Sequence, residues 1–260
     1  VKDPQRVREL LQGTAKLEFW ETYENPEVIG YLMEANNLLV DIKADMEALE
    51  QAEGEETDAA VEGEVSSVDD LVDQETEQDT TGDKALLDML SDTTSTEEAE
   101  SRNEWNEQNP LFAVLNPAVT RDGQPLPGSP IGYAHFLDTA QVIDYLKMNQ
   151  VRSIFPRDMR FYWSADPMRG DDTESIYQLH AIKVTTRDGQ PPLDGDVITS
   201  ARVSYGQTGS NAKVDMSMNA EGARTWARLT GANIGECIAV VLDGYVRSAP
   251  TVSSEIRGGS

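Results

Sequence analysis

Two histidines are the first residues of this chain that could do chemistry, because an imidazole binds metals and transfers protons near neutral pH. His135 and His180 lie 45 positions apart, and neither has an acidic or cysteine partner at the spacing of a metal-binding motif. His180 also lies in a run that alternates apolar and polar side chains, as a half-buried strand does. We therefore expect a structural histidine at position 180 and no metal site.

Motifs for nucleophiles, phosphates and nucleotides are absent from the sequence. There is no G-x-S-x-G elbow, no phosphate-binding P-loop and no G-x-G-x-x-G turn after a strand. The single cysteine, Cys237, lies in the apolar run ECIAVVL, where we expect a small buried side chain. We expect no catalytic residue, no cofactor and no enzymatic turnover.

The charge of the chain is strongly negative and unevenly spread. The formal net charge is −26, and the segment of about residues 45–104 carries 22 Asp and Glu against only Lys84 and Arg102. Such a chain repels phosphate backbones, so nucleic acid is not an expected partner. The segment contains no D-x-[DN]-x-[DN]-G calcium loop. Its high charge and few large apolar residues predict a partly flexible, partly helical excursion.

Helices are predicted where apolar residues recur with helical spacing. We expect one long helix or two in the segment 26–51, and one or two amphipathic turns at residues 83–92 within the acidic segment. Asp138 or Thr139 is the expected N-cap of one helix, and Asn219 of another. The remaining predicted helices span residues 4–13, 138–148 and 219–231.

Strands are predicted from alternation and from turn residues. The strongest signal is the run 237–250, in which Asp243 and Gly244 separate two apolar stretches, as in a tight hairpin. We expect structural roles for these two residues, for Gly222 in the last helix and for Pro250 at the end of the last strand. The other predicted strands are 14–23, 109–117, 159–165, 176–184, 197–206 and 212–218.

Three stretches of the chain resemble the first periplasmic domain of the SecD/SecDF family, which assists the Sec protein translocase. They are VKDPQRVRELLQGTAKLEF at the start, LDGDVITSARV, and the closing NAEGARTWARLTGANIGECIAVVLDGYVRSAPTVSSEIRGGS. Together they cover about the first 20 and the last 70 residues. The family's polypeptide continues past the closing glycine pair, so the resemblance implies that this chain is a piece of a longer protein.

The resemblance implies an α+β fold with a ferredoxin-like base subdomain, built from a split βαβ unit and an antiparallel sheet. The base would comprise residues 1–20 and 193–260. An α+β head subdomain would be inserted as residues 21–192, and it would contain the acidic segment. The inserted part is longer and more acidic than is usual for the family.

The function that the resemblance implies is help with the late, proton-motive-force-driven steps of preprotein export. The expected partners are SecF, either separate or fused, the SecYEG channel and the unfolded preprotein. The expected location is the periplasmic side of the inner membrane, within a multi-pass parent protein. The alternative is the periplasmic porter-type domain of a related proton-driven exporter of small molecules or lipids.

Aromatic residues of the inserted part are the candidate contacts for a preprotein. They are Tyr133, Phe136, Tyr162 and Trp163, which occur in alternating runs. Aromatic side chains at such spacing also serve as core residues, so both roles stay open at this point.

Overall fold

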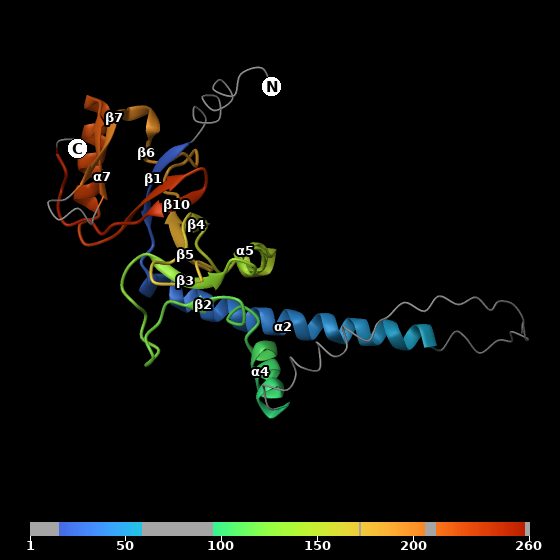
Figure 1. The fold of residues 1–260 in the computed structure, drawn as a ribbon. Coiled ribbons are helices and arrows are strands. Elements are labelled where there is room, and N and C mark those ends of the chain that lie inside the picture. The colour runs from blue at the N-terminus through green and yellow to red at the C-terminus, as the bar shows by residue number, and fades with distance from the viewer. Residues whose placement is uncertain (1–15, 59–95, 172, 206–211, 258–260) are drawn as a thin grey trace, which may run out of the picture. The chain divides into compact units, whose positions relative to one another are not determined.

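The structure is a computed structural model that describes residues 16–58, 96–171, 173–205 and 212–257 (Figure 1). Its helices are α2 (Asn25–Asp58), α4 (Thr96–Gln108), α5 (Thr139–Lys147), α6 (Asn149–Arg152) and α7 (Ala220–Ala232), with one 3-10 helix, η1 (Gly195–Val197). Its strands are β1 (Leu17–Thr22), β2 (Asn116–Pro117), β3 (Pro130–His135), β4 (Met159–Trp163), β5 (Ile176–Lys183), β6 (Leu193–Asp194), β7 (Ile198–Tyr205), β8 (Ala212–Met218), β9 (Ile238–Leu242) and β10 (Tyr245–Ser248).

The chain divides into two compact units. Residues 37–113 form one unit, and residues 1–36 together with 114–260 form the other. The smaller unit contains the later part of α2 and all of α4, and Leu39 and Leu111 are buried in it. The helix predicted for residues 26–51 is therefore one helix, and it continues into the acidic segment as far as Asp58.

The larger unit is built on an antiparallel sheet. Its strands follow the order β10-β9-β1-β5-β3-β2, while β4 pairs with β5 and β6 pairs with β1. Trp20 of β1 is the register partner of Ala239 of β9, so the first described strand and the last hairpin are neighbours in one sheet. The mixed helix and antiparallel-strand class expected from the sequence is confirmed.

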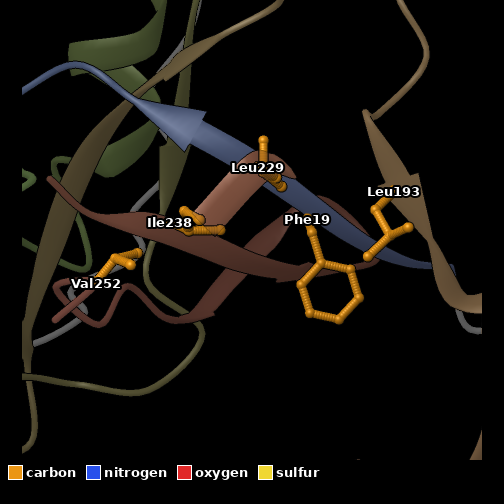
Figure 2. Packing of buried hydrophobic residues seen from close by; sticks show 5 residues of the cluster. All are labelled: Phe19, Leu193, Leu229, Ile238 and Val252. Atoms are coloured by element: carbon orange, nitrogen blue, oxygen red, sulfur yellow. The ribbon is translucent and has the colours of Figure 1, made fainter. Parts of the chain in front are cut away.

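Consecutive side chains of β1 supply two hydrophobic clusters, because successive residues of a strand point to opposite faces. Figure 2 shows the first cluster, which contains Phe19 and Leu229 of α7. The ring of Phe19 meets Trp226 edge-on, with centroids 5.3 Å apart. The second cluster contains Trp20, Ile182, Ala239, Val241 and Val246.

The hairpin of β9 and β10 has the predicted two-residue turn. Asp243 and Gly244 both have positive φ angles, 51° and 84°. This left-handed backbone is the one that a type I′ turn requires. The predicted strands around it are confirmed as β9 and β10.

Strands β7 and β8 form a separate two-stranded sheet that leads into α7. The N-cap predicted for α7 is confirmed, because the side-chain oxygen of Asn219 accepts a hydrogen bond of 2.8 Å from the Gly222 amide. For α5, Asp138 occupies the N-cap position but its side chain makes no capping bond. The hydroxyl of Thr139 instead donates to the Phe136 carbonyl at 2.8 Å.

One predicted strand is wrong over most of its length. Residues 110–114 form turns, and only Asn116–Pro117 are in a strand. The amide of Ala113 donates to the carbonyl of Asn109 at 2.8 Å, which is a helical type of bond. The helix predicted for residues 4–13 and the amphipathic turns predicted for residues 83–92 lie outside the described residues.

Candidate functional site

Four of the residues singled out in the sequence line one hollow of about 460 Å³, which we call the aromatic groove. They are Tyr162, Trp163, Asp243 and Gly244. The groove lies in the larger unit, where α5, α6 and β4 meet the turn of the last hairpin. Its full lining consists of Ile143, Leu146, Lys147, Arg152, Met159, Arg160, Phe161, Tyr162, Trp163, Asp243, Gly244 and Tyr245.

The other predicted residues lie elsewhere. Tyr133 is half-buried in β3, and Phe136, 52% exposed, follows that strand. Pro250 follows β10, and its carbonyl accepts a hydrogen bond from the Ile238 amide at 3.2 Å. Gly222 lies in the first turn of α7, against Val197.

The aromatic side chains of the groove differ in burial. Phe161 packs edge-on against Phe155, with centroids 5.1 Å apart. Trp163 is 9% exposed, and its indole N–H has no hydrogen-bond partner among the described residues. Tyr162 is half-buried, and burial, followed by the nearby Glu18 carboxylate, raises the pKa of its phenol. Tyr245 is 54% exposed, so it is the most accessible of the groove's aromatic side chains.

Basic residues line one part of the groove. Lys147, Arg152 and Arg160 are all lining residues, whereas Asp243 is the only acidic one. Arg152 is held by hydrogen bonds to the carbonyls of Phe155, Pro156, Arg157 and Met159. Burial, and next the charge of Arg160, lower the pKa of its guanidinium. In a chain of net charge −26, this local positive charge favours an anionic ligand group.

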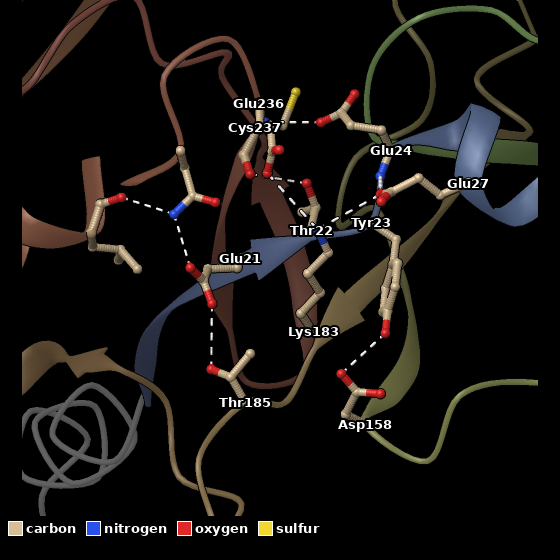
Figure 3. A network of polar contacts seen from close by, with 12 residues as sticks. Glu21, Thr22, Tyr23, Glu24, Glu27, Asp158, Lys183, Thr185, Glu236 and Cys237 are labelled. Carbon is tan, nitrogen blue, oxygen red and sulfur yellow. Dashed lines mark hydrogen bonds and ion pairs between the residues drawn. The ribbon is translucent and has the colours of Figure 1, made fainter. Parts of the chain in front are cut away.

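A network of polar contacts fixes the strands on which the groove depends (Figure 3). The phenol of Tyr23 donates to the Asp158 carboxylate at 3.0 Å, immediately before β4. Burial, and next this bond, raise the pKa of the Tyr23 phenol well above its usual value. The hydroxyl of Thr22 donates to the Cys237 carbonyl, and the Cys237 amide donates to Glu24, each at 2.9 Å.

The same network connects β1 and the start of α2 with β5 and the end of α7. Lys183 forms ion pairs with Glu27 at 3.6 Å and with Glu236 at 3.8 Å. Glu21 accepts a bond from the side chain of Asn233 at 2.9 Å. These contacts join segments from both ends of the larger unit, so the position of β4 depends on residues far away in the sequence.

His180 lies beside a second cavity, of about 420 Å³. It is buried, and its Nδ1 atom is 3.0 Å from the hydroxyl of Ser129. Burial lowers the pKa of His180 to about 4, so its ring is neutral at pH 7. A neutral, buried imidazole with a serine partner agrees with the structural role expected for it.

The described part of the chain contains neither a cluster of metal-binding side chains nor a helix able to span a membrane. No group of three or more His, Cys, Asp or Glu side chains there could hold a metal ion. Cys237 is a buried free thiol, as its apolar sequence context predicted. None of the described helices combines the length and the apolar composition that crossing a membrane requires.

Comparison with known proteins gives related sequences along the whole chain. All 260 residues align at 35% identity with the protein translocase subunit SecD of Rhodothermus marinus, and they span 35% of that protein's length. The model of the SecDF P1 head subdomain matches residues 173–260. The chain is thus similar to SecD translocase subunits along its whole length and to the SecDF P1 head subdomain in its last third. The resemblance found in the sequence is thereby confirmed.

Further relatives cover smaller parts. SecD of Leptotrichia buccalis is 34% identical over 137 residues, which are 44% of this chain and 33% of that protein. A solved structure of SecDF, described as a membrane component that enhances protein export, has 22% identity and a TM-score of 0.26. The match covers 47% of this chain and 58% of the chain in that structure. The chain thus spans about a third of the length of these SecD relatives.

The matching family model names the C-terminal part of this chain differently from the name that the resemblance implied. It applies the name head to residues 173–260. The resemblance implied that residues 193–260 belong to the base.

Sequence reasoning missed several residues of the groove. Phe161 and Tyr245 were not among the predicted site residues. Phe161 directly precedes Tyr162, and Tyr245 directly follows Gly244, both of which were predicted. Ile143 of α5 also lines the groove and is half-buried. The one available signal for Tyr245 was its position directly after the Asp243–Gly244 turn, where a side chain is exposed on a strand edge.

Proposed function

We propose that this chain is the periplasmic part of a SecD-type subunit and that it contacts the preprotein emerging from the SecYEG channel. Its parent would be a multi-pass protein of the inner membrane that acts with SecF, and the chain would lie on the periplasmic side. The proposal rests on one observation above all, the 35% identity to a protein translocase subunit over all 260 residues. The role itself is non-enzymatic help with the late, proton-motive-force-driven steps of export.

The aromatic groove is the proposed contact surface. Its exposed tyrosine and its apolar lining residues suit an unfolded chain, because the free energy falls when apolar side chains leave water. Tyr162 and Trp163 remain proposed contacts on this basis. Tyr133 and Phe136 would belong to a separate surface at β3.

We further propose that β1, β9 and β10 belong to one subdomain, as the division into residues 1–20 and 193–260 requires. The antiparallel pairing of β1 with β9 supports this grouping. The family model gives the C-terminal part of this subdomain the name head in place of base. The ferredoxin-like arrangement of a split βαβ unit is part of the same proposal.

The test is site-specific crosslinking in membranes that contain the full-length parent and the Sec channel. A photoreactive amino acid replaces Tyr245, and a matched variant carries it at exposed Ser200 in β7. A stalled preprotein should crosslink at position 245 and not at position 200. Equal yields at both positions, or crosslinking at 245 only to a small-molecule or lipid probe, would contradict the proposal and favour a porter-type exporter domain.

A further inference from the structure

We propose that β4 is an open strand edge to which an extended polypeptide adds as a further strand, within the aromatic groove. The favoured segment carries a large apolar side chain next to an acidic one. This inference rests on the proposed function and specifies how that function recognises its polypeptide. Strand addition reads the peptide backbone, so it suits substrates of many sequences.

The first observation is that β4 has a strand on one side only. Among the named strands of the described residues, β4 pairs with β5 alone. The Ser164 amide donates to the Gln178 carbonyl at 2.7 Å, at the end of this ladder. In an antiparallel ladder, hydrogen-bonded residues alternate with residues whose backbone groups point away from the partner strand. Since Ser164 is bonded to β5, the backbone N–H and C=O groups of the even-numbered residues of β4 point to β5. The N–H and C=O groups of Phe161 therefore point to the open edge.

The second observation is that the groove follows this edge. All five residues of β4, Met159–Trp163, line it, although their side chains alternate between the two faces of the sheet. A hollow that touches every residue of a strand in this way runs along the strand's backbone. A peptide in the groove would thus have its main chain beside the free groups of Phe161.

The third observation is that the chain itself pairs with this edge just beyond the groove. Ser164 and Val246 form a parallel bridge, and the Ala165 amide donates to the Val246 carbonyl at 2.8 Å. An ion pair of 3.4 Å between Arg247 and Asp166 lies next to it. Strand β10 begins only at Tyr245, so it does not reach Phe161. A bound peptide would continue the pairing that β10 starts.

Side-chain selectivity follows from the lining. Ile143, Leu146 and Tyr245 offer contacts to a large apolar side chain. Lys147 and Arg160 lie within the same groove, and a neighbouring hollow adds Arg157. A carboxylate on the peptide is attracted to these cations, and added salt should weaken that attraction.

The test measures binding of a fluorescein-labelled nine-residue peptide, in which valine and glutamate alternate around a central phenylalanine, to the 260-residue chain by fluorescence anisotropy. The same peptide with its three central amides N-methylated keeps all side chains but cannot form the strand bonds. We expect it to bind at least about tenfold more weakly. Exchange of glutamate for glutamine should weaken binding at low salt, and the difference should shrink at high salt.

A pair of variants tests the protein side. Phe161→Pro removes the outward N–H, so peptide affinity should fall about tenfold. The matched control Phe161→Leu keeps this N–H, so peptide affinity should change less than about threefold. If the Phe161→Pro variant does not fold, the comparison of the plain and N-methylated peptides binding to the unaltered chain still tests strand addition. Equal binding of the plain and N-methylated peptides, or no binding of either, would overturn strand addition. The proposed function would then still be supported by crosslinking of the preprotein at position 245 in the intact translocase. If the preprotein does not crosslink there, the proposed function itself is contradicted.

Discussion

The backbone of Gly222 lies directly against the side chain of Val197. A Cβ atom placed on Gly222 would be 2.6 Å from the Cβ and 2.7 Å from the Cγ2 of Val197, closer than real side chains approach. Val197 ends η1, and Gly222 lies in the first turn of α7. The close approach lets α7 pack against the segment that leads into β7.

Replacing Gly222 with alanine should therefore destabilise the chain. The clash and the shift that it forces should lower the free energy of unfolding by about 1–3 kcal/mol, despite the better helix propensity of alanine. Gly30→Ala in α2 is the matched control, because nothing lies within 4 Å of a Cβ at that position. The control should be neutral or raise the free energy of unfolding by up to about 1 kcal/mol in urea titrations. Equal effects of the two substitutions would contradict the packing described for α7.

Two buried tryptophans should respond differently to replacement by phenylalanine. The indole N–H of Trp20 donates to the carboxylate of Glu18 at 2.9 Å, whereas that of Trp163 has no partner among the described residues. Trp20→Phe should lower the free energy of unfolding by about 1.5–3 kcal/mol, because a bond to a buried charged group is lost. Trp163→Phe should cost less than about 1.5 kcal/mol, since only volume changes and an unpaired donor disappears. A larger loss for Trp163→Phe than for Trp20→Phe in the same denaturation experiment would contradict this expectation.

Burial of His180 should make the stability of the chain depend on pH. Its pKa is about 4 in the folded state and about 6.5 in an unfolded chain. Because the unfolded state binds the proton more readily, the contribution of His180 is complete above about pH 6.5 and is lost as the pH falls toward 4. The full loss amounts to about 3 kcal/mol.

His180→Gln removes this contribution and leaves the carboxylates as they are. The difference in unfolding free energy between the two proteins should therefore change between pH 7 and pH 4 and become constant below it. Other groups around the cavity, Asp166, Arg169 and Arg247, are present in both proteins and cancel in the comparison. A difference that stays constant from pH 7 to pH 4 would show that the His180 ring is not held neutral by its surroundings.

Much of the local structure could be predicted because its causes lie within a few residues of sequence. The Asp243–Gly244 turn needs only two residues that tolerate positive φ, and the Asn219 cap needs one side chain and the next amides. The strand predicted at residues 109–117 failed because apolar residues between prolines fit a buried turn equally well. Periodicity is ambiguous in such short runs.

The groove was beyond the reach of these local signals. Tyr162 and Trp163 came from an alternating run and Tyr245 from a hairpin about 80 residues later, and nothing in either segment states that they meet. Tyr23 and Asp158 likewise had no pattern that joined them. The sequence by itself determined the acidic character and many of the helices and strands, since these depend on residue types and short spacings. The resemblance to SecD/SecDF was likewise visible in the sequence. Only the tertiary structure decided which strand edge stays open and what lines it, because those features arise from packing between segments that are distant along the chain.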